Sequence, residues 1–137
     1  MITLPIDLEL ILGRGHVRPL EGSELIYEPD DPYAVVMVTR DEMHGTVQVW
    51  TFARDLLTDG LARQLEPRTG GDVRVWRCNP VEVHITLDSP DGRCELHAIA
   101  DDIDQFLTLT YAAVPLCHEM DGVDMDRELA AIMGGTA

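Results

Sequence analysis

VWTFARDLL (residues 49–57) runs from an alternating apolar segment into a segment with near-helical spacing of apolar residues. Thr51 is a candidate cap for this helix, and Gly60 stands where a short helix would end. After a Gly- and Pro-rich loop, a second strand opens at GDVRVW (residues 71–76). In both stretches the charged residues are interleaved with apolar ones, as they are when they hold an element in place. The pattern indicates a binding or scaffolding protein rather than an enzyme.

The rest of the chain repeats this plan of strands followed by a helix. Strands are predicted over 4–12, 25–27, 34–39, 46–50, 72–78, 81–87 and 93–100. A second helix opens at Asp102, where Gln105 completes a capping box, and a last helix spans Met125–Met133. We therefore predict one α+β domain over residues 1–137, with two antiparallel sheet units each followed by a helix, plus a C-terminal helix. Its pseudo-repeat halves span about residues 1–66 and 71–137.

Composition narrows the classes of function. The chain has 137 residues, 45% of them apolar, which is enough for a folded core. Its formal net charge is −15, which disfavours both a phosphate backbone and an anionic membrane as partners. The first residues carry acid early and have no basic segment, so we expect a cytoplasmic protein without direct membrane insertion.

A metal site is considered at Cys78, His84, Cys94 and His97. A tight turn at Pro90-Asp91 would set His84 opposite His97 on the polar face of a hairpin. Cys94, however, falls on the opposite face of its strand from His97, so the four side chains do not converge. The sequence therefore predicts no metal ligands.

Catalytic and calcium motifs are not found. The acids of residues 121–126 have the wrong order for a calcium loop, because Gly122 comes second. No G-x-S-x-G occurs, and the adjacent Cys117 and His118 diverge rather than meet as nucleophile and base. We predict no catalytic residues and no cofactor.

Two arginines and two tryptophans remain as interaction candidates. Arg54 and Arg74 could be hot spots of an interface, but a structural ion pair, Arg54 with Asp72 or Asp55 with Arg74, is the favoured interpretation. Trp50 and Trp76 end matching strands in the two halves and are expected in the core.

At these residues the chain resembles the SsgA-like proteins of actinomycetes. The similar segments are Asp31–Val35, Trp50–Leu57 with Gly60-Leu61, and Gly71–Trp76, with weaker similarity at Ser89–Gly92 and Asp124–Leu129. The family-motif residues, candidates for a structural or an interaction role, are Asp31, Tyr33, Trp50, Phe52, Arg54, Asp55, Asp72, Arg74 and Trp76.

The resemblance implies a fold like that of Whirly and mitochondrial guide-RNA-binding proteins, assembled as a symmetric oligomer, with a homotrimer expected. It also implies a non-enzymatic adaptor of sporulation-specific septation, located at the division septum. Such an adaptor would recruit or stabilise the tubulin-like protein FtsZ and bind other SsgA-like proteins. The alternative is a single-stranded nucleic-acid-binding protein of Whirly-like fold, which would need a basic groove with stacked aromatic residues.

Overall fold

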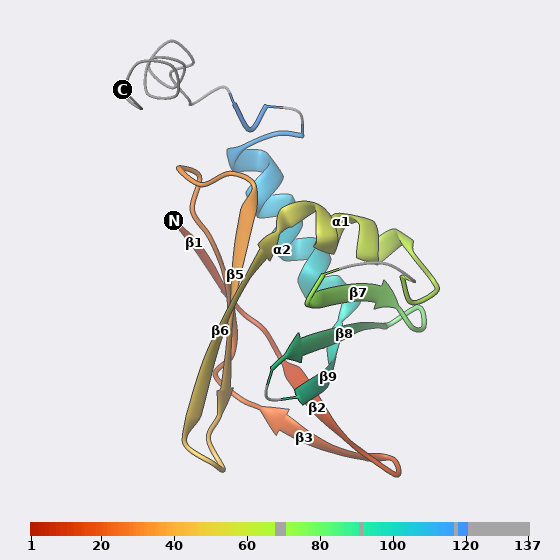
Figure 1. Ribbon diagram of the computed structural model, residues 1–137. Helices are drawn as coiled ribbons and strands as arrows, with labels where there is room; N and C mark the ends of the chain where they lie inside the picture. The colour runs from red at the N-terminus through yellow and green to blue at the C-terminus, as the bar shows by residue number, and fades with distance from the viewer. Residues whose placement is uncertain (68–70, 91, 117, 121–137) are drawn as a thin grey trace, which may run out of the picture.

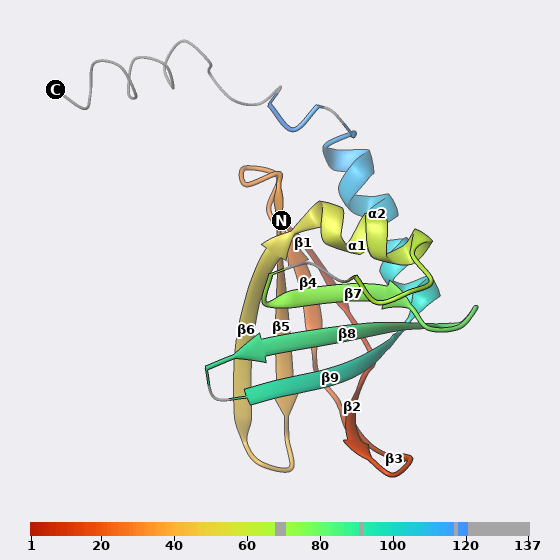
Figure 2. The same ribbon diagram turned by 45° about the vertical axis from the view of Figure 1, so that its right-hand side comes forward.

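Two antiparallel sheets form the body of the protein (Figures 1 and 2). The computed structural model describes residues 1–67, 71–90, 92–116 and 118–120. The four-stranded sheet has the order β1-β4-β5-β6 and the five-stranded sheet the order β3-β2-β9-β8-β7. The strands are β1 (Ile2–Pro5), β2 (Leu8–Gly13), β3 (His16–Leu20), β4 (Glu24–Tyr27), β5 (Ala34–Asp41), β6 (Thr46–Ala53), β7 (Val73–Arg77), β8 (Glu82–Ser89) and β9 (Gly92–Ile99).

Each half of the chain ends its strands with a helix, as predicted. α1 (Arg54–Ala62) follows β6, and α2 (Ala100–Ala113) follows β9. The predicted caps are wrong, because the residues that precede the helices are Ala53 and Ile99, and neither makes a side-chain capping bond. Among the described residues, neither helix combines the length and the apolar character needed to span a membrane. The predicted helix Met125–Met133 lies outside the described residues.

The two halves do not each build their own sheet. The alternating segment 4–12 was predicted as one strand, but the chain turns after Pro5, so β1 joins one sheet and β2 the other. The turn is held by the Ile6 N–H, which donates to the Ser23 carbonyl over 3.0 Å. Ile6 and Leu8 are both buried, so the apolar alternation continues through the turn and conceals it. β3, an edge strand containing Pro19, was not predicted.

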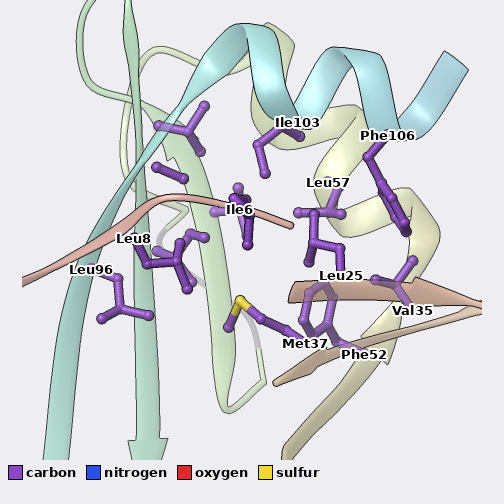
Figure 3. Close-up of a cluster of buried hydrophobic side chains, with 14 of the residues drawn as sticks. Ile6, Leu8, Leu25, Val35, Met37, Phe52, Leu57, Leu96, Ile103 and Phe106 are labelled. Carbon is purple, nitrogen blue, oxygen red and sulfur yellow. The ribbon is translucent and has the colours of Figure 1, made fainter. Parts of the chain in front are cut away.

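The core lies between the sheets and under both helices (Figure 3). The predicted buried positions of α2 are confirmed, since Ile103, Phe106 and Leu107 pack into it. Strand residues with alternate numbers supply most of the rest, among them Leu25, Val35, Met37, Phe52, Val75, Val83, Ile85 and Leu96, together with Leu57 of α1 and Ile6.

Gly60 lies inside α1 rather than at its end, as the sequence had suggested. A Cβ atom at this position would lie 2.8 Å from the Val75 Cβ, and nearer still to a methyl group of Val75. Only glycine therefore lets α1 pack this closely on β7.

Candidate functional site

Arg54 lies at the junction between β6 and α1. Its side chain is only 1% exposed and is the largest fully buried one among the described residues. Its backbone N–H donates to the Tyr33 carbonyl over 2.7 Å. The junction is thereby fixed to the connection between β4 and β5.

The Arg54 guanidinium binds the C-terminal end of α2. Nη1 donates to the carbonyls of Thr110 (3.3 Å) and Val114 (2.8 Å), and Nη2 donates to Glu119 Oε1 (3.2 Å). The Thr110 carbonyl also accepts the Val114 N–H over 2.8 Å. The last carbonyls of a helix carry partial negative charge, so a cation here stabilises them. Arg54 thus ties together elements that are 56 to 65 residues apart.

Two tyrosine rings enclose the same guanidinium. Its Cζ lies 4.0 Å from the ring centroid of Tyr111 and 5.2 Å from that of Tyr27. The Tyr27 hydroxyl donates to the Pro32 carbonyl over 2.8 Å, and the Tyr111 hydroxyl lies 2.6 Å from Thr58 Oγ1. Burial raises the pKa of Tyr27, while the nearby Arg54 charge opposes this shift. We call Tyr27, Arg54, Thr58, Tyr111 and Glu119 the Arg54 cluster.

Arg54 and Arg74 both form ion pairs, as predicted, but the predicted partners were wrong for both arginines. Arg54 pairs with Glu119 rather than Asp72. Arg74 pairs with Glu66 (3.0 Å) and Asp88 (3.3 Å). The predicted partners were wrong because the two side chains lie in different places. Arg54 points along the end of α2, whereas Arg74 lies on the outer face of the five-stranded sheet. Asp55 and Asp72 are exposed.

The other family-motif residues divide between core and surface. Phe52 belongs to the core, and Trp50 packs against it, as predicted. Asp31 shapes the connection between β4 and β5, donating its N–H to the Glu28 carbonyl (2.8 Å) and accepting from the Ala34 N–H (3.3 Å). Tyr33 belongs to the same connection, and its side chain is exposed.

Trp76 was predicted in the core, and this was wrong. Val73 and Val75 occupy the inward positions of β7, which leaves Trp76 on the outer face of the sheet. There its ring stacks on His84, with centroids 4.3 Å apart and an interplanar angle of 22°. Trp76 therefore lies in a different region from the Arg54 cluster.

His84 and His97 face each other beside Trp76, as the hairpin prediction required. They are directly opposed in the pairing of β8 with β9, and His84 Nδ1 lies 3.2 Å from His97 Nε2. Burial and then the neighbouring His97 lower the pKa of His84. Cys94 faces the opposite way and packs against the core, which confirms that the four predicted side chains do not converge. Within the described ranges, no three His, Cys, Asp or Glu residues are grouped to hold a metal ion.

An apolar surface lies on β6, one of the two edge strands of the four-stranded sheet. β6 pairs with β5 but with no other described strand. Val47 and Val49 are exposed on it, whereas the neighbouring Val38, opposite Val49, is buried. Figure 1 shows the helices and the other sheet on one side of these strands, and no described element on the other. An open strand edge beside exposed valines is suited to pairing with another chain.

These features define a small two-sheet α+β protein with a structural arginine and an open apolar edge. The chain belongs to the family described as "Streptomyces sporulation and cell division protein, SsgA", whose model matches residues 22–119. It is 38% identical to the sporulation-specific cell division protein SsgB of Frankia casuarinae, over 98% of this chain and 92% of the relative. Identity to SsgB of Streptomyces coelicolor is also 38%, over 96% and 95% of the two chains.

Solved structures of the family have the same fold. A crystal structure of an SsgA-like sporulation-specific cell division protein from Thermobifida fusca superposes with a TM-score of 0.79 at 36% identity, covering 96% of this chain and 95% of that one. A structure from work on SsgB mutations and longitudinal cell division in Streptomyces coelicolor gives a TM-score of 0.78 at 36% identity, covering 88% and 93%. The α+β arrangement of two antiparallel sheets and two helices is thus the arrangement of these relatives.

Proposed function

We propose that this protein is a non-enzymatic adaptor of sporulation-specific septation in actinomycete cell division. In this proposal it lies in the cytoplasm at the division septum and recruits or stabilises FtsZ through protein–protein contacts, without a cofactor. Relatives that are 38% identical and are named sporulation-specific cell division proteins support the division role.

The observation that carries the adaptor proposal is the open β6 edge. Its unpaired backbone groups and the exposed valines, Val47 and Val49, support pairing with a complementary surface on another copy of the chain. Most soluble oligomers are closed and symmetric, and a cyclic homotrimer, the assembly expected from the resemblance, would cover one such edge per subunit. The same edge could accept another SsgA-like protein.

Symmetric assembly would explain how a small acidic protein binds a polymer. A trimer presents three copies of any FtsZ-binding surface, and a polymer presents many copies of its own surface. Linking weak contacts in this way raises the overall affinity by about 10²–10⁴-fold without any new contact. Isolated subunits would then bind FtsZ weakly, whereas the assembly would bind and stabilise its filaments.

Sedimentation of FtsZ polymers tests the proposal. FtsZ is polymerised with GTP in the presence and absence of this protein, and an unrelated acidic protein of similar size controls for trapping. We expect this protein to pellet with GTP polymers and to slow their disassembly. A folded oligomer that stays in the supernatant would contradict FtsZ binding. A salt-dependent shift with a single-stranded oligonucleotide would instead favour the nucleic-acid alternative.

A further inference from the structure

The outer face of the five-stranded sheet brings two histidine nitrogens together. His84 on β8 and His97 on β9 are direct cross-strand partners, and their Nδ1 and Nε2 atoms are 3.2 Å apart. The ring planes meet at 74°, with centroids 5.0 Å apart. If both rings were aligned along the line that joins these two nitrogens, their centroids would be further apart than the observed distance. At least one of the two rings is therefore inclined to that line.

A carboxylate lies behind each of the two imidazole rings. Glu82 Oε2 lies 3.4 Å from His97 Nδ1, and Glu95 Oε1 lies 3.8 Å from His84 Nε2. The carboxylate beside His97 Nδ1 favours the tautomer with the N–H on that nitrogen, whereas His84 Nε2 is buried without a hydrogen-bond partner. One of the two inner nitrogens, His84 Nδ1 and His97 Nε2, can donate a hydrogen bond to the other, and a metal ion between them would take the place of that proton. A carboxylate behind each imidazole is also the usual support of histidine metal ligands.

The spacing of the inner nitrogens suits a transition-metal ion. Two Zn–N bonds of about 2.05 Å at a tetrahedral angle hold their nitrogens about 3.3 Å apart. The observed 3.2 Å between His84 Nδ1 and His97 Nε2 is close to this value. We propose that these two atoms bind a divalent transition-metal ion, Zn²⁺ in the first place, with water in the remaining positions. This goes beyond the sequence-based prediction that the chain has no metal ligands.

The surroundings favour a cation and leave it a path. His97 lines a surface hollow of about 290 Å³ together with four acidic side chains, Asp7, Glu9, Glu21 and Glu82. The His97 side chain is 26% exposed and the His84 side chain 14%. The ion would therefore reach the pair from the acidic hollow, while the Trp76 ring covers the other side of His84. With two protein ligands among the described residues, the bound ion would exchange readily.

Calorimetry with variants tests the site directly. Untagged, metal-free protein is titrated with Zn²⁺, and each of His84→Gln and His97→Gln is expected to abolish the binding heat. Glu82→Gln keeps both ligands but removes the carboxylate behind His97, so binding should weaken about tenfold. The matched control is His16→Gln, an exposed histidine on β3 of the same sheet, which should bind as the wild type does.

Tryptophan fluorescence gives an independent readout. Trp76 stacks on His84, whereas Trp50, the other tryptophan, lies in the four-stranded sheet. Ni²⁺, which also prefers imidazole ligands and is paramagnetic, should quench part of the wild-type emission. That quenching should be lost in Trp76→Phe and in His97→Gln.

Two results would overturn the proposal. Zn²⁺ binding of wild-type affinity in both His→Gln variants would place the ion elsewhere, for example at the exposed Cys78 thiol. A wild-type protein with neither binding heat nor quenching would exclude the site altogether. Far-UV circular dichroism of the metal-free variants checks their folding, and if one of them fails to fold, Glu82→Gln must still weaken binding.

Discussion

Replacing Arg54 with methionine removes the guanidinium from the Arg54 cluster while retaining most of its apolar volume. The variant leaves the Glu119 carboxylate, whose side chain is 10% exposed, and the Thr110 and Val114 carbonyls without these donors. Removing one partner of a buried ion pair costs about 3–5 kcal/mol. We expect Arg54→Met to lower the free energy of unfolding by this amount.

The partners of Arg54 predict how second substitutions combine. Glu119→Gln removes the charge that Arg54→Met would leave unpaired, so the double variant should be more stable than the sum of the two single losses predicts. Contacting residues of this kind show coupling energies of about 0.5–3 kcal/mol. Arg74→Met is the matched control, because its partners Glu66 and Asp88 are much more exposed. It should cost only about 1 kcal/mol or less.

Urea unfolding at one fixed protein concentration measures all four variants. A fixed concentration is required because self-association adds to the apparent stability. The slope of the unfolding free energy against urea should stay unchanged, so that the midpoint alone reports the loss. The reasoning is refuted if Arg54→Met costs no more than Arg74→Met, or if the Arg54 and Glu119 effects simply add.

Two further predictions concern α1 and α2. Gly60→Ala should lower the free energy of unfolding by about 1–3 kcal/mol despite the better helix propensity of alanine, because the new Cβ meets Val75. Adding Val75→Ala in the same chain should recover part of this loss in urea unfolding. Equal stability of Gly60→Ala and wild type would contradict this packing. Burial, and then the Asp7 and Asp101 carboxylates, raise the pKa of Asp102, so its contribution to stability is fully present below the unfolded-state pKa and is lost as the pH rises through the folded-state pKa. Asp102→Asn should therefore raise the melting temperature at about pH 7, with a gain that shrinks toward about pH 4, and a pH-independent difference would count against the raised pKa.

Local sequence patterns predicted where the strands and helices lie better than they predicted which of these elements contact each other. The α2 positions Ile103, Phe106 and Leu107 and the pairing of His84 with His97 follow from periodicity and one turn, both of which are local. The division of residues 4–12 between two sheets depends on a turn at Ile6 whose hydrogen-bond partner is Ser23. Alternation alone contains no signal for such a turn.

The Arg54 cluster shows the same limit at the level of a site. The motif around Arg54 indicated a structural role, but Thr110, Val114 and Glu119 lie 56 to 65 residues further on, with no charge pattern that links them to it. Tyr27 and Tyr111 are likewise recognisable as partners only after folding. For Trp76 the error was one of direction, since Val73 and Val75 take the core positions of the same strand.

We propose that self-association through β6 makes this protein an effective partner of FtsZ polymers. The most direct measurement compares Val49→Lys, on the β6 edge, with Val81→Lys at equal chain concentration. The two valines are 63% and 60% exposed, but Val81 lies in the connection between β7 and β8. A lysine on an edge strand opposes strand pairing, so Val49→Lys should sediment as a monomer and lose co-pelleting with FtsZ, while Val81→Lys keeps both properties. A Val49→Lys protein that remains oligomeric, or a monomer that pellets as well as the wild type, would contradict the claim.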